Sequence, residues 1–257
     1  FIEASVSSDK VSVQEQVILT VQLFTSVNLR SINSDELELE DTLQLELSEL
    51  RYQKRINGKP YAVIEVKYAR FPQTSGTLHI PSLTYTAPTK GRVRDPWSDP
   101  FGTQTGELKR LKTKALDVEV LPASSAYTGQ HWLPSSKLAL EQEWSNDPST
   151  FKVGEPITRV ITLTAEGLTG AQLPPLDLPD VEGIKYYPDQ AQTQDQTSEN
   201  GLIGIRTETL ALVPMKSGKV TLPEISVSWW DTQAKRQRIA TLPATQIQVA
   251  PSPVMQQ

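Results

Sequence analysis

Residues 11–23 read Val-Ser-Val-Gln-Glu-Gln-Val-Ile-Leu-Thr-Val-Gln-Leu. From position 17 onward an apolar side chain recurs at every second residue, as in a β-strand that buries one face. The segment 153–163 repeats this order as Val-Gly-Glu-Pro-Ile-Thr-Arg-Val-Ile-Thr-Leu. Arg159 stands there at the position that Leu19 holds in the first copy. Because an unpaired buried charge is costly, we expect Arg159 to be partly buried with its guanidinium group hydrogen-bonded.

Further matches indicate that the chain contains one module twice. Asn57-Gly58 corresponds to Asn200-Gly201 at an offset of 143 residues, and Ser75-Gly76 corresponds to Ser217-Gly218 at an offset of 142. The final strands, at 116–120 and 245–249, are only 129 residues apart, so the first copy carries about 13 additional residues before its last strand. We therefore predict a first domain at 1–122 with an insertion loop at 88–110, a linker at 123–136, a second domain at 137–251 and a tail at 252–257.

Turn and strand signals favour an all-β fold. Each Asn-Gly pair lies between extended segments and is a strong hairpin signal, because both turn residues need a positive φ. Short apolar strands end at Pro81 and Pro223, where proline interrupts the pairing of a ladder. About seven short strands per copy, with closely spaced turns, predict two tandem immunoglobulin-like β-sandwich domains. The only helical candidate is 34–50, where we expect at most one turn near Asp35.

Composition limits the classes of function. The chain has 257 residues, more than one typical domain, and its 37% hydrophobic residues suffice for buried cores. The net charge of −5 argues against nucleic acid or an anionic membrane surface as partner, because both require basic patches. No window reaches the roughly 20 apolar residues of a membrane span. The start at Phe1 is expected for a mature or trimmed N-terminus, with a signal peptide or an anchor outside this fragment.

The sequence lacks motifs for catalysis or cofactor binding. It has no cysteine, and its two histidines, His79 and His131, have no neighbouring ligand pattern. We expect His79 to be a half-exposed residue of a strand and His131 to pack between the domains. The chain is therefore predicted not to be an enzyme and to hold no cofactor or metal. The acidic run at 35–41 is interpreted as a solvated face, with a surface for a basic or metal-bearing partner as the alternative.

The insertion loop contains the candidate residues for partner binding. Long loops on a rigid scaffold commonly carry function, and an exposed aromatic side chain near arginine is typical of a binding hot spot. The candidates are Asp95, Trp97, Asp99 and Phe101. In the alternative, Trp97 and Phe101 fold back over a sheet edge of their own sandwich, and the sequence leaves both interpretations open.

A second aromatic candidate is Trp229-Trp230, at the end of an alternating strand. Parity with Ile225 and Val227 predicts that Trp229 faces inward and Trp230 outward. Trp230 would then be partly covered by a neighbouring loop. In the alternative, it would offer a stacking platform for a sugar.

Several segments together indicate a known family. They are 1–6 with 13–17, 57–58 with 75–81, and, in the second copy, 154–168, 172–174, 185–189, Val213-Pro214, Leu222-Pro223 and Trp229-Trp230. Over nearly the whole chain they resemble the BatD family, the bacterial "oxygen tolerance" proteins. The resemblance implies immunoglobulin-like domains that follow a signal peptide and precede a transmembrane helix, with no catalytic motif. The fragment would be the N-terminal periplasmic part of a protein anchored in the inner membrane.

The resemblance also implies partners. Genes of this family lie beside those for a MoxR-type AAA+ ATPase and for von Willebrand A-domain proteins, so we expect an adaptor that binds A-domain proteins in stress or oxygen tolerance. Such A-domains commonly hold a metal whose open position is filled by a partner's carboxylate, a hard oxygen ligand suited to Mg²⁺. Asp95 or Asp99 beside Trp97 would supply it, with the acidic run as a further candidate. The alternative function is carbohydrate binding at the cell envelope.

Overall fold

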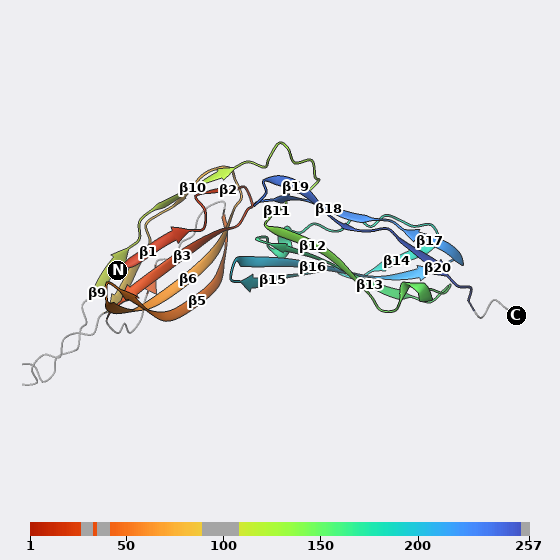
Figure 1. Cartoon of the computed structure of the whole chain (residues 1–257), viewed down its shortest axis with the longest axis horizontal. Coiled ribbons are helices and arrows are strands. Elements are labelled where there is room, and N and C mark those ends of the chain that lie inside the picture. The colour runs from red at the N-terminus through yellow and green to blue at the C-terminus, as the bar shows by residue number, and fades with distance from the viewer. Residues whose placement is uncertain (27–32, 35–41, 89–107, 253–257) are drawn as a thin grey trace, which may run out of the picture. The chain divides into compact units, whose positions relative to one another are not determined.

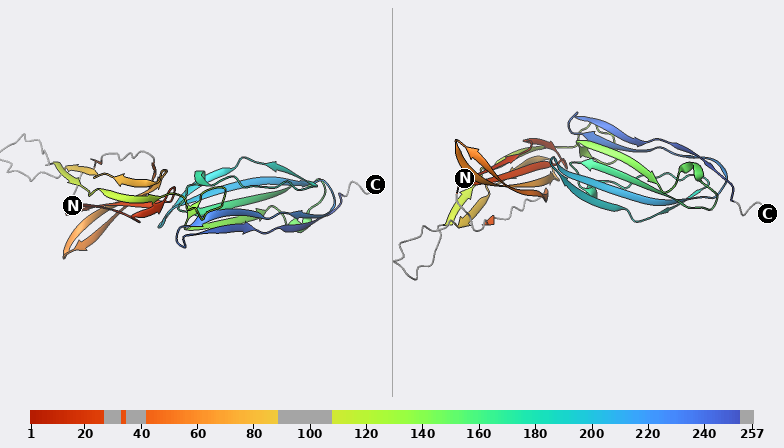
Figure 2. Two further views of the ribbon diagram at one scale, coloured as in Figure 1. Left: turned by 90° about the horizontal axis from the view of Figure 1, so that it is seen from above. Right: turned by 60° about the horizontal axis from the view of Figure 1, so that its bottom comes forward.

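The computed structural model describes residues 1–26, 33–34, 42–88 and 108–252. The chain forms two compact units, Phe1–Pro122 and Ala123–Gln257 (Figure 1). The strands of each unit lie in two layers (Figure 2), so the predicted fold class, an all-β immunoglobulin-like sandwich, is confirmed, and the two units are consistent with the predicted tandem pair. Within the described ranges, no helix has the length and apolar character needed to cross a bilayer. The helical turn predicted near Asp35 lies outside these ranges.

The first unit consists of strands in three sheets. Its strands are β1 (Ile2–Val6), β2 (Lys10–Ser12), β3 (Val17–Thr25), β4 (Asn33–Ser34), β5 (Thr42–Ile56), β6 (Lys59–Pro72), β7 (Gly76–Ile80), β8 (Thr84–Pro88), β9 (Leu108–Lys112) and β10 (Leu116–Leu121). The sheet orders are β1-β3-β6-β5, β2-β10-β7 and β4-β8-β9. Val17, Leu19, Val21 and Leu23 of β3 are buried, as their alternation predicted. The buried residues of this core are Val11, Val17, Leu19, Val21, Ile80, Leu83, Val118 and Val120.

The second unit repeats this plan. Its elements are β11 (Pro134–Ser135), β12 (Lys137–Trp144), η1 (Pro148–Thr150), β13 (Ile157–Glu166), η2 (Gly170–Gln172), β14 (Ile184–Pro188), β15 (Gln192–Ser198), β16 (Gly201–Pro214), β17 (Gly218–Leu222), β18 (Ile225–Asp231), β19 (Arg236–Leu242) and β20 (Thr245–Val249). The main sheet has the order β12-β13-β16-β14, and β15 also pairs with β16. β17 pairs with β20, and β11-β18-β19 form the remaining sheet. Residues 123–136, predicted as a linker, belong to this unit.

The hairpin of β5 and β6 shows how the two copies differ. Its turn residues Asn57 and Gly58 have φ values of 50° and 78°, the left-handed backbone that an Asn-Gly turn requires. A register shift between Glu46 and Ser48 divides β5 into two arms along β6. In the second unit the corresponding strand is divided into two, β14 and β15. β14 pairs with residues 210–214 of β16, and β15 pairs with residues 201–207. A bulge in the first copy therefore corresponds to a strand break in the second.

Arg159 occupies an inward-facing position of its strand, as the alternation of apolar residues predicted. Its side chain lies in β13 and the residue is 3% exposed. Nε and Nη2 donate hydrogen bonds to Gln142 Oε1 at 2.9 and 2.6 Å, and the guanidinium carbon lies 5.0 Å from the centre of the Trp144 ring. Burial lowers the pKa of Arg159, and the nearby Tyr186 opposes that shift. The expected hydrogen bonding of the guanidinium group is confirmed, and the residue is fully buried where we expected partial burial.

Candidate interaction surface

The insertion loop is anchored by an antiparallel ladder at both of its ends. β8 and β9 pair from Thr84 with Lys112 to Pro88 with Leu108. The predicted partner-binding residues between these strands lie outside the described residues: Asp95, Trp97, Asp99 and Phe101. The acidic run at 35–41 also lies outside them.

Trp230 is covered by the segment that precedes β12. Trp229 and Trp230 are 6% and 7% exposed, so both indoles are buried. The Trp132 ring lies 5.7 Å from that of Trp230, and Tyr127 meets Trp132 edge-on at 5.1 Å. The Tyr127 hydroxyl lies within hydrogen-bond distance of the carbonyls of Ser228 and His131, which share its one proton, and burial raises its pKa to about 12. The predicted cover by a neighbouring segment is therefore present, and Trp230 offers no free face for a sugar.

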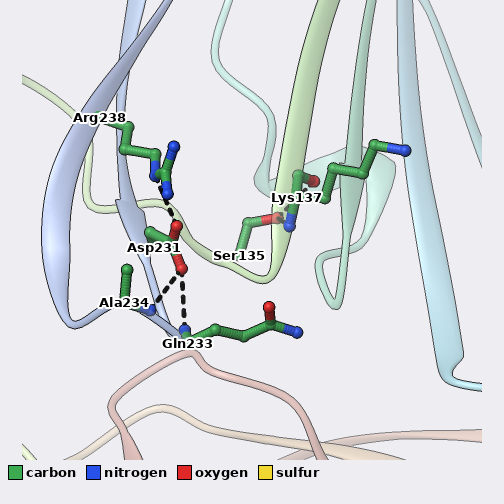
Figure 3. A network of polar contacts seen from close by, with 6 residues as sticks. All are labelled: Ser135, Lys137, Asp231, Gln233, Ala234 and Arg238. Carbon is green, nitrogen blue, oxygen red and sulfur yellow. Dashed lines mark hydrogen bonds and ion pairs between the residues drawn. The ribbon is translucent and has the colours of Figure 1, made fainter.

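Backbone pairing joins this segment to the end of β18, where a polar network surrounds Asp231 (Figure 3). Ser135 pairs with Asp231 in a parallel ladder, and the Ser135 carbonyl accepts a hydrogen bond from the backbone N–H of Thr232. The Asp231 carboxylate accepts hydrogen bonds from the N–H groups of Gln233 and Ala234 and forms an ion pair with Arg238, 2.6 Å from Oδ2 to Nε. The network organises a turn, and its buried carboxylate is fully engaged there.

An aromatic surface lies on the outer face of the main sheet of the first unit. We call it the hairpin face and define it by five residues: Phe1, Phe24, Leu50, Tyr52 and Tyr61. The Phe1 ring stacks on Phe24 with 4.4 Å between centroids and meets Tyr61 edge-on at 5.7 Å. Phe1, Leu50 and Tyr52 are 45%, 50% and 37% exposed, so the cluster presents apolar surface to solvent. Exposed aromatic and apolar side chains in one place are typical of protein-binding surfaces.

A buried carboxylate supports the hairpin face from beneath. Glu65 is 9% exposed and accepts hydrogen bonds from Gln22 Nε2 at 2.6 Å and from the Tyr52 hydroxyl at 2.9 Å. Burial acts to raise the pKa of Glu65, but these hydrogen bonds and the nearby Lys67 outweigh it and lower the pKa. The carboxylate therefore stays charged and fixes the orientation of the Tyr52 ring.

The remaining polar groups of interest are the two histidines. His79 Nδ1 lies 2.6 Å from Asp117 Oδ1 in the ladder between β7 and β10, and both side chains are more than half exposed. His131 is exposed, and its packing between the domains stays a prediction. In the part of the chain that the structure describes, no group of three His, Asp or Glu residues could hold a metal ion.

Sequence reasoning missed the hairpin face. Phe1 reaches Phe24 because β1 pairs antiparallel with β3, and Tyr61 joins them because β6 lies on the other side of β3. These contacts depend on strand order and register, which local periodicity does not specify. A usable signal was the stretch 51–64, which has two tyrosines and four cations but no acidic residue.

The fold and this surface define a class of protein, a tandem β-sandwich module with a surface suited to protein contacts. The family model described as "BatD DUF11 like domain" matches residues 4–120 and 144–249. These ranges cover most of both units, and the chain belongs to the BatD family. A search of curated protein sequences finds no match.

Three of the solved structures that match this chain are the following. A Corynebacterium diphtheriae protein described as membrane anchored is 11% identical with a TM-score of 0.25, and the alignment covers 97% of this chain and 58% of that one. The Yersinia pseudotuberculosis adhesin InvE is 10% identical with a TM-score of 0.21, over 94% and 57% of the two chains. The BspA C-terminal domain of Streptococcus agalactiae is 8% identical with a TM-score of 0.23, over 96% and 100%. The chain thus spans less than two thirds of the first two proteins.

Proposed function

We propose that this chain is the extracytoplasmic protein-binding part of a BatD protein that is anchored in the inner membrane. Its partners are von Willebrand A-domain proteins of a MoxR ATPase system, and its role lies in stress or oxygen tolerance. The observation that carries the proposal is the hairpin face, where Phe1, Leu50 and Tyr52 expose apolar surface on the main sheet of the first unit. Family membership supports the choice of partner.

The insertion loop is the proposed site for the A-domain. Its support is the β8–β9 ladder, which holds both ends of the loop on a folded scaffold. Asp95 or Asp99 would complete the coordination of the partner's Mg²⁺, because carboxylate oxygens are preferred ligands of this ion. Trp97 and Phe101 would anchor the contact by burial. No chemistry on a substrate is proposed.

The direct test is co-purification from membranes. The full-length protein, tagged at the end opposite its anchor, is solubilised with each A-domain protein encoded beside it. We expect one of these proteins to be retained at high wash stringency. The same tagged protein without residues 1–122 serves as the control for capture through the membrane part. If no A-domain protein is retained above this control, the proposal is wrong.

A further inference from the structure

The outer edge of β5 is open along the described part of the chain. β5 is the last strand of its sheet and pairs only with β6. β3 ends at Thr25, which pairs with Ala62 of β6. Past this point β5 and β6 pair with each other for three more residue pairs, the last of which is Ile56 with Lys59. The turn end of this hairpin, drawn in orange, stands away from the other layer in Figure 2. Alternate residues of an edge strand direct unpaired N–H and C=O groups outward, where another strand can add.

The same hairpin carries a concentration of positive charge. Residues 51–64 contain Arg51, Lys54, Arg55 and Lys59 and no acidic residue, in a chain whose net charge is −5. All four cationic residues are exposed. Arg51 pairs with Glu49, and Lys54 lies 5.7 Å from the Phe24 ring, but Arg55 and Lys59 form no ion pair with any described residue. The turn end therefore presents uncompensated charge to solvent.

The second copy shows that the positive charge is not required by the fold. Its corresponding hairpin segment, 192–205, has Asp195 and Glu199 and no cation. Its strand β15 is exposed along its whole length and pairs, among the described strands, with β16 alone. Both copies therefore have an exposed hairpin strand, and only the first copy has basic side chains beside it.

We propose that an extended acidic segment of a protein partner adds to β5 as a further strand. Its backbone pairs with the outer edge of β5, and its carboxylates lie beside Arg55 and Lys59. Tyr52 and Leu50 of the hairpin face contact its apolar side chains. A peptide fits better than an anionic membrane, because only a peptide can complete the backbone hydrogen bonds of the strand edge and because the chain as a whole is acidic. This inference rests on the proposed function and specifies one partner chemistry within it.

The test uses an acetylated and amidated peptide of alternating glutamate and threonine, about ten residues long, added to the ¹⁵N-labelled chain at low salt. We expect shift changes along β5 and slower exchange of alternate β5 amides, because strand addition protects every second amide. A peptide of alternating glutamate and proline has the same charge but cannot pair as a strand. It should bind at least about tenfold more weakly.

The matched variants separate local charge from net charge. Lys54→Glu, Arg55→Glu and Lys59→Glu together should weaken binding at least about tenfold, since like charges then face each other. Lys185→Glu, Lys219→Glu and Arg236→Glu make the same change in net charge at exposed positions of the second unit and should bind as wild type does. Unchanged melting temperatures of both variants establish that they fold.

Three results would overturn the inference. They are no shift changes with the threonine peptide, equal binding of the proline peptide, and binding of the hairpin to phosphatidylserine vesicles but not to the peptide. If the peptide fails while an A-domain protein still co-purifies, this inference alone falls. If the peptide binds and no A-domain protein co-purifies, the proposed partner falls and the strand-addition site stands.

Discussion

Each unit buries one arginine of its main sheet, but in different electrostatic surroundings. Arg159 is hydrogen-bonded to Gln142 and lies over Trp144. Arg70 in β6 is 1% exposed, and its Nε and Nη1 have no hydrogen-bond partner. Burial lowers the pKa of Arg70 to about 10, although Tyr68 partly opposes the shift. By register, the position of Arg70 is occupied by Leu212 in the second unit.

Substitution of the two arginines should therefore have opposite effects. Arg159→Ala loses hydrogen bonds and packing and should lower the free energy of unfolding by about 2–4 kcal/mol. Lys152→Ala, whose ammonium group lies 3.8 Å from Glu155 in an exposed pair, should change it by less than about 0.5 kcal/mol.

Arg70→Leu, in contrast, copies the residue of the second unit. It should be neutral or raise the free energy of unfolding by about 1–3 kcal/mol, because an apolar residue relieves the desolvation of an unpaired charge. Urea titrations of the three variants provide the measurement. A loss of more than about 1 kcal/mol in Arg70→Leu would show that this guanidinium group has a stabilising partner.

Asp231 should make the second unit sensitive to acid. The backbone N–H of Ala234 lowers the pKa of Asp231 most, and the backbone N–H of Gln233 and the Arg238 side chain lower it further. Burial opposes these effects but does not outweigh them. The pKa is then lower in the folded than in the unfolded chain, where it is about 3.9. The stabilisation is therefore present above about pH 4 and is lost as the pH falls through the folded pKa.

We expect Asp231→Asn to lower the free energy of unfolding by about 1–2 kcal/mol at neutral pH. As the pH falls below about 4 and through the lowered folded pKa, the difference from wild type should shrink, since the wild-type carboxylate becomes protonated. Urea titrations at neutral and at acidic pH test this, with the exposed Asp177→Asn as the matched control. A difference that stays constant with pH would contradict the assignment.

At the scale of elements, one glycine sets how closely η2 approaches the main sheet of the second unit. A Cβ on Gly204 of β16 would lie 2.6 Å from the N of Gly170 and 2.7 Å from the carbonyl oxygen of Leu168. Both atoms belong to backbone and cannot rotate away. The substitution must therefore move η2 away from β16 or bend the strand.

We predict that Gly204→Ala lowers the free energy of unfolding by about 2–3 kcal/mol. Gly58→Ala should cost only about 1 kcal/mol, because a Cβ there meets nothing within 4 Å and only the φ of 78° is unfavourable. Thermal melts of both variants make the comparison. Equal losses would mean that η2 shifts at little cost.

Periodicity and turn chemistry explain which elements could be predicted. The alternation in β3 and β13 specified their buried faces, including that of Arg159, and the Asn-Gly pairs specified two hairpins. The bulge in β5 and the identity of the residues that cover Trp230 were not predictable in this way. Both arise from contacts between segments distant in sequence, as in the hydrogen bond from Tyr127 to Ser228. The hairpin face has the same origin, and the predicted loop residues lie outside the described ranges.

At the scale of the whole molecule, residues 123–136 are a structural part of the second unit. Tyr127 and Trp132 cover Trp230, and β11 adds a parallel strand to β18. A fragment of residues 123–257 should fold, whereas a fragment of residues 137–257 exposes Trp230 and leaves the Thr232 N–H unpaired. We expect the shorter fragment to be less stable by about 2–3 kcal/mol. Urea titration followed by tryptophan fluorescence tests this, and equal stabilities would contradict it.

The proposed function concerns the whole molecule as a binding partner, and calorimetry tests it most directly. The chain is titrated with the cognate A-domain in Mg²⁺ and after chelation, as wild type and as Asp95→Ala, Trp97→Ala and Asp99→Ala. We predict saturable heat with one A-domain per chain, and affinity at least about tenfold weaker after chelation and in Trp97→Ala and one of the two aspartate variants. No binding heat from the wild-type chain in Mg²⁺ would contradict the proposed function. Wild-type binding that survives chelation and all three substitutions would exclude the metal and this loop as the contact.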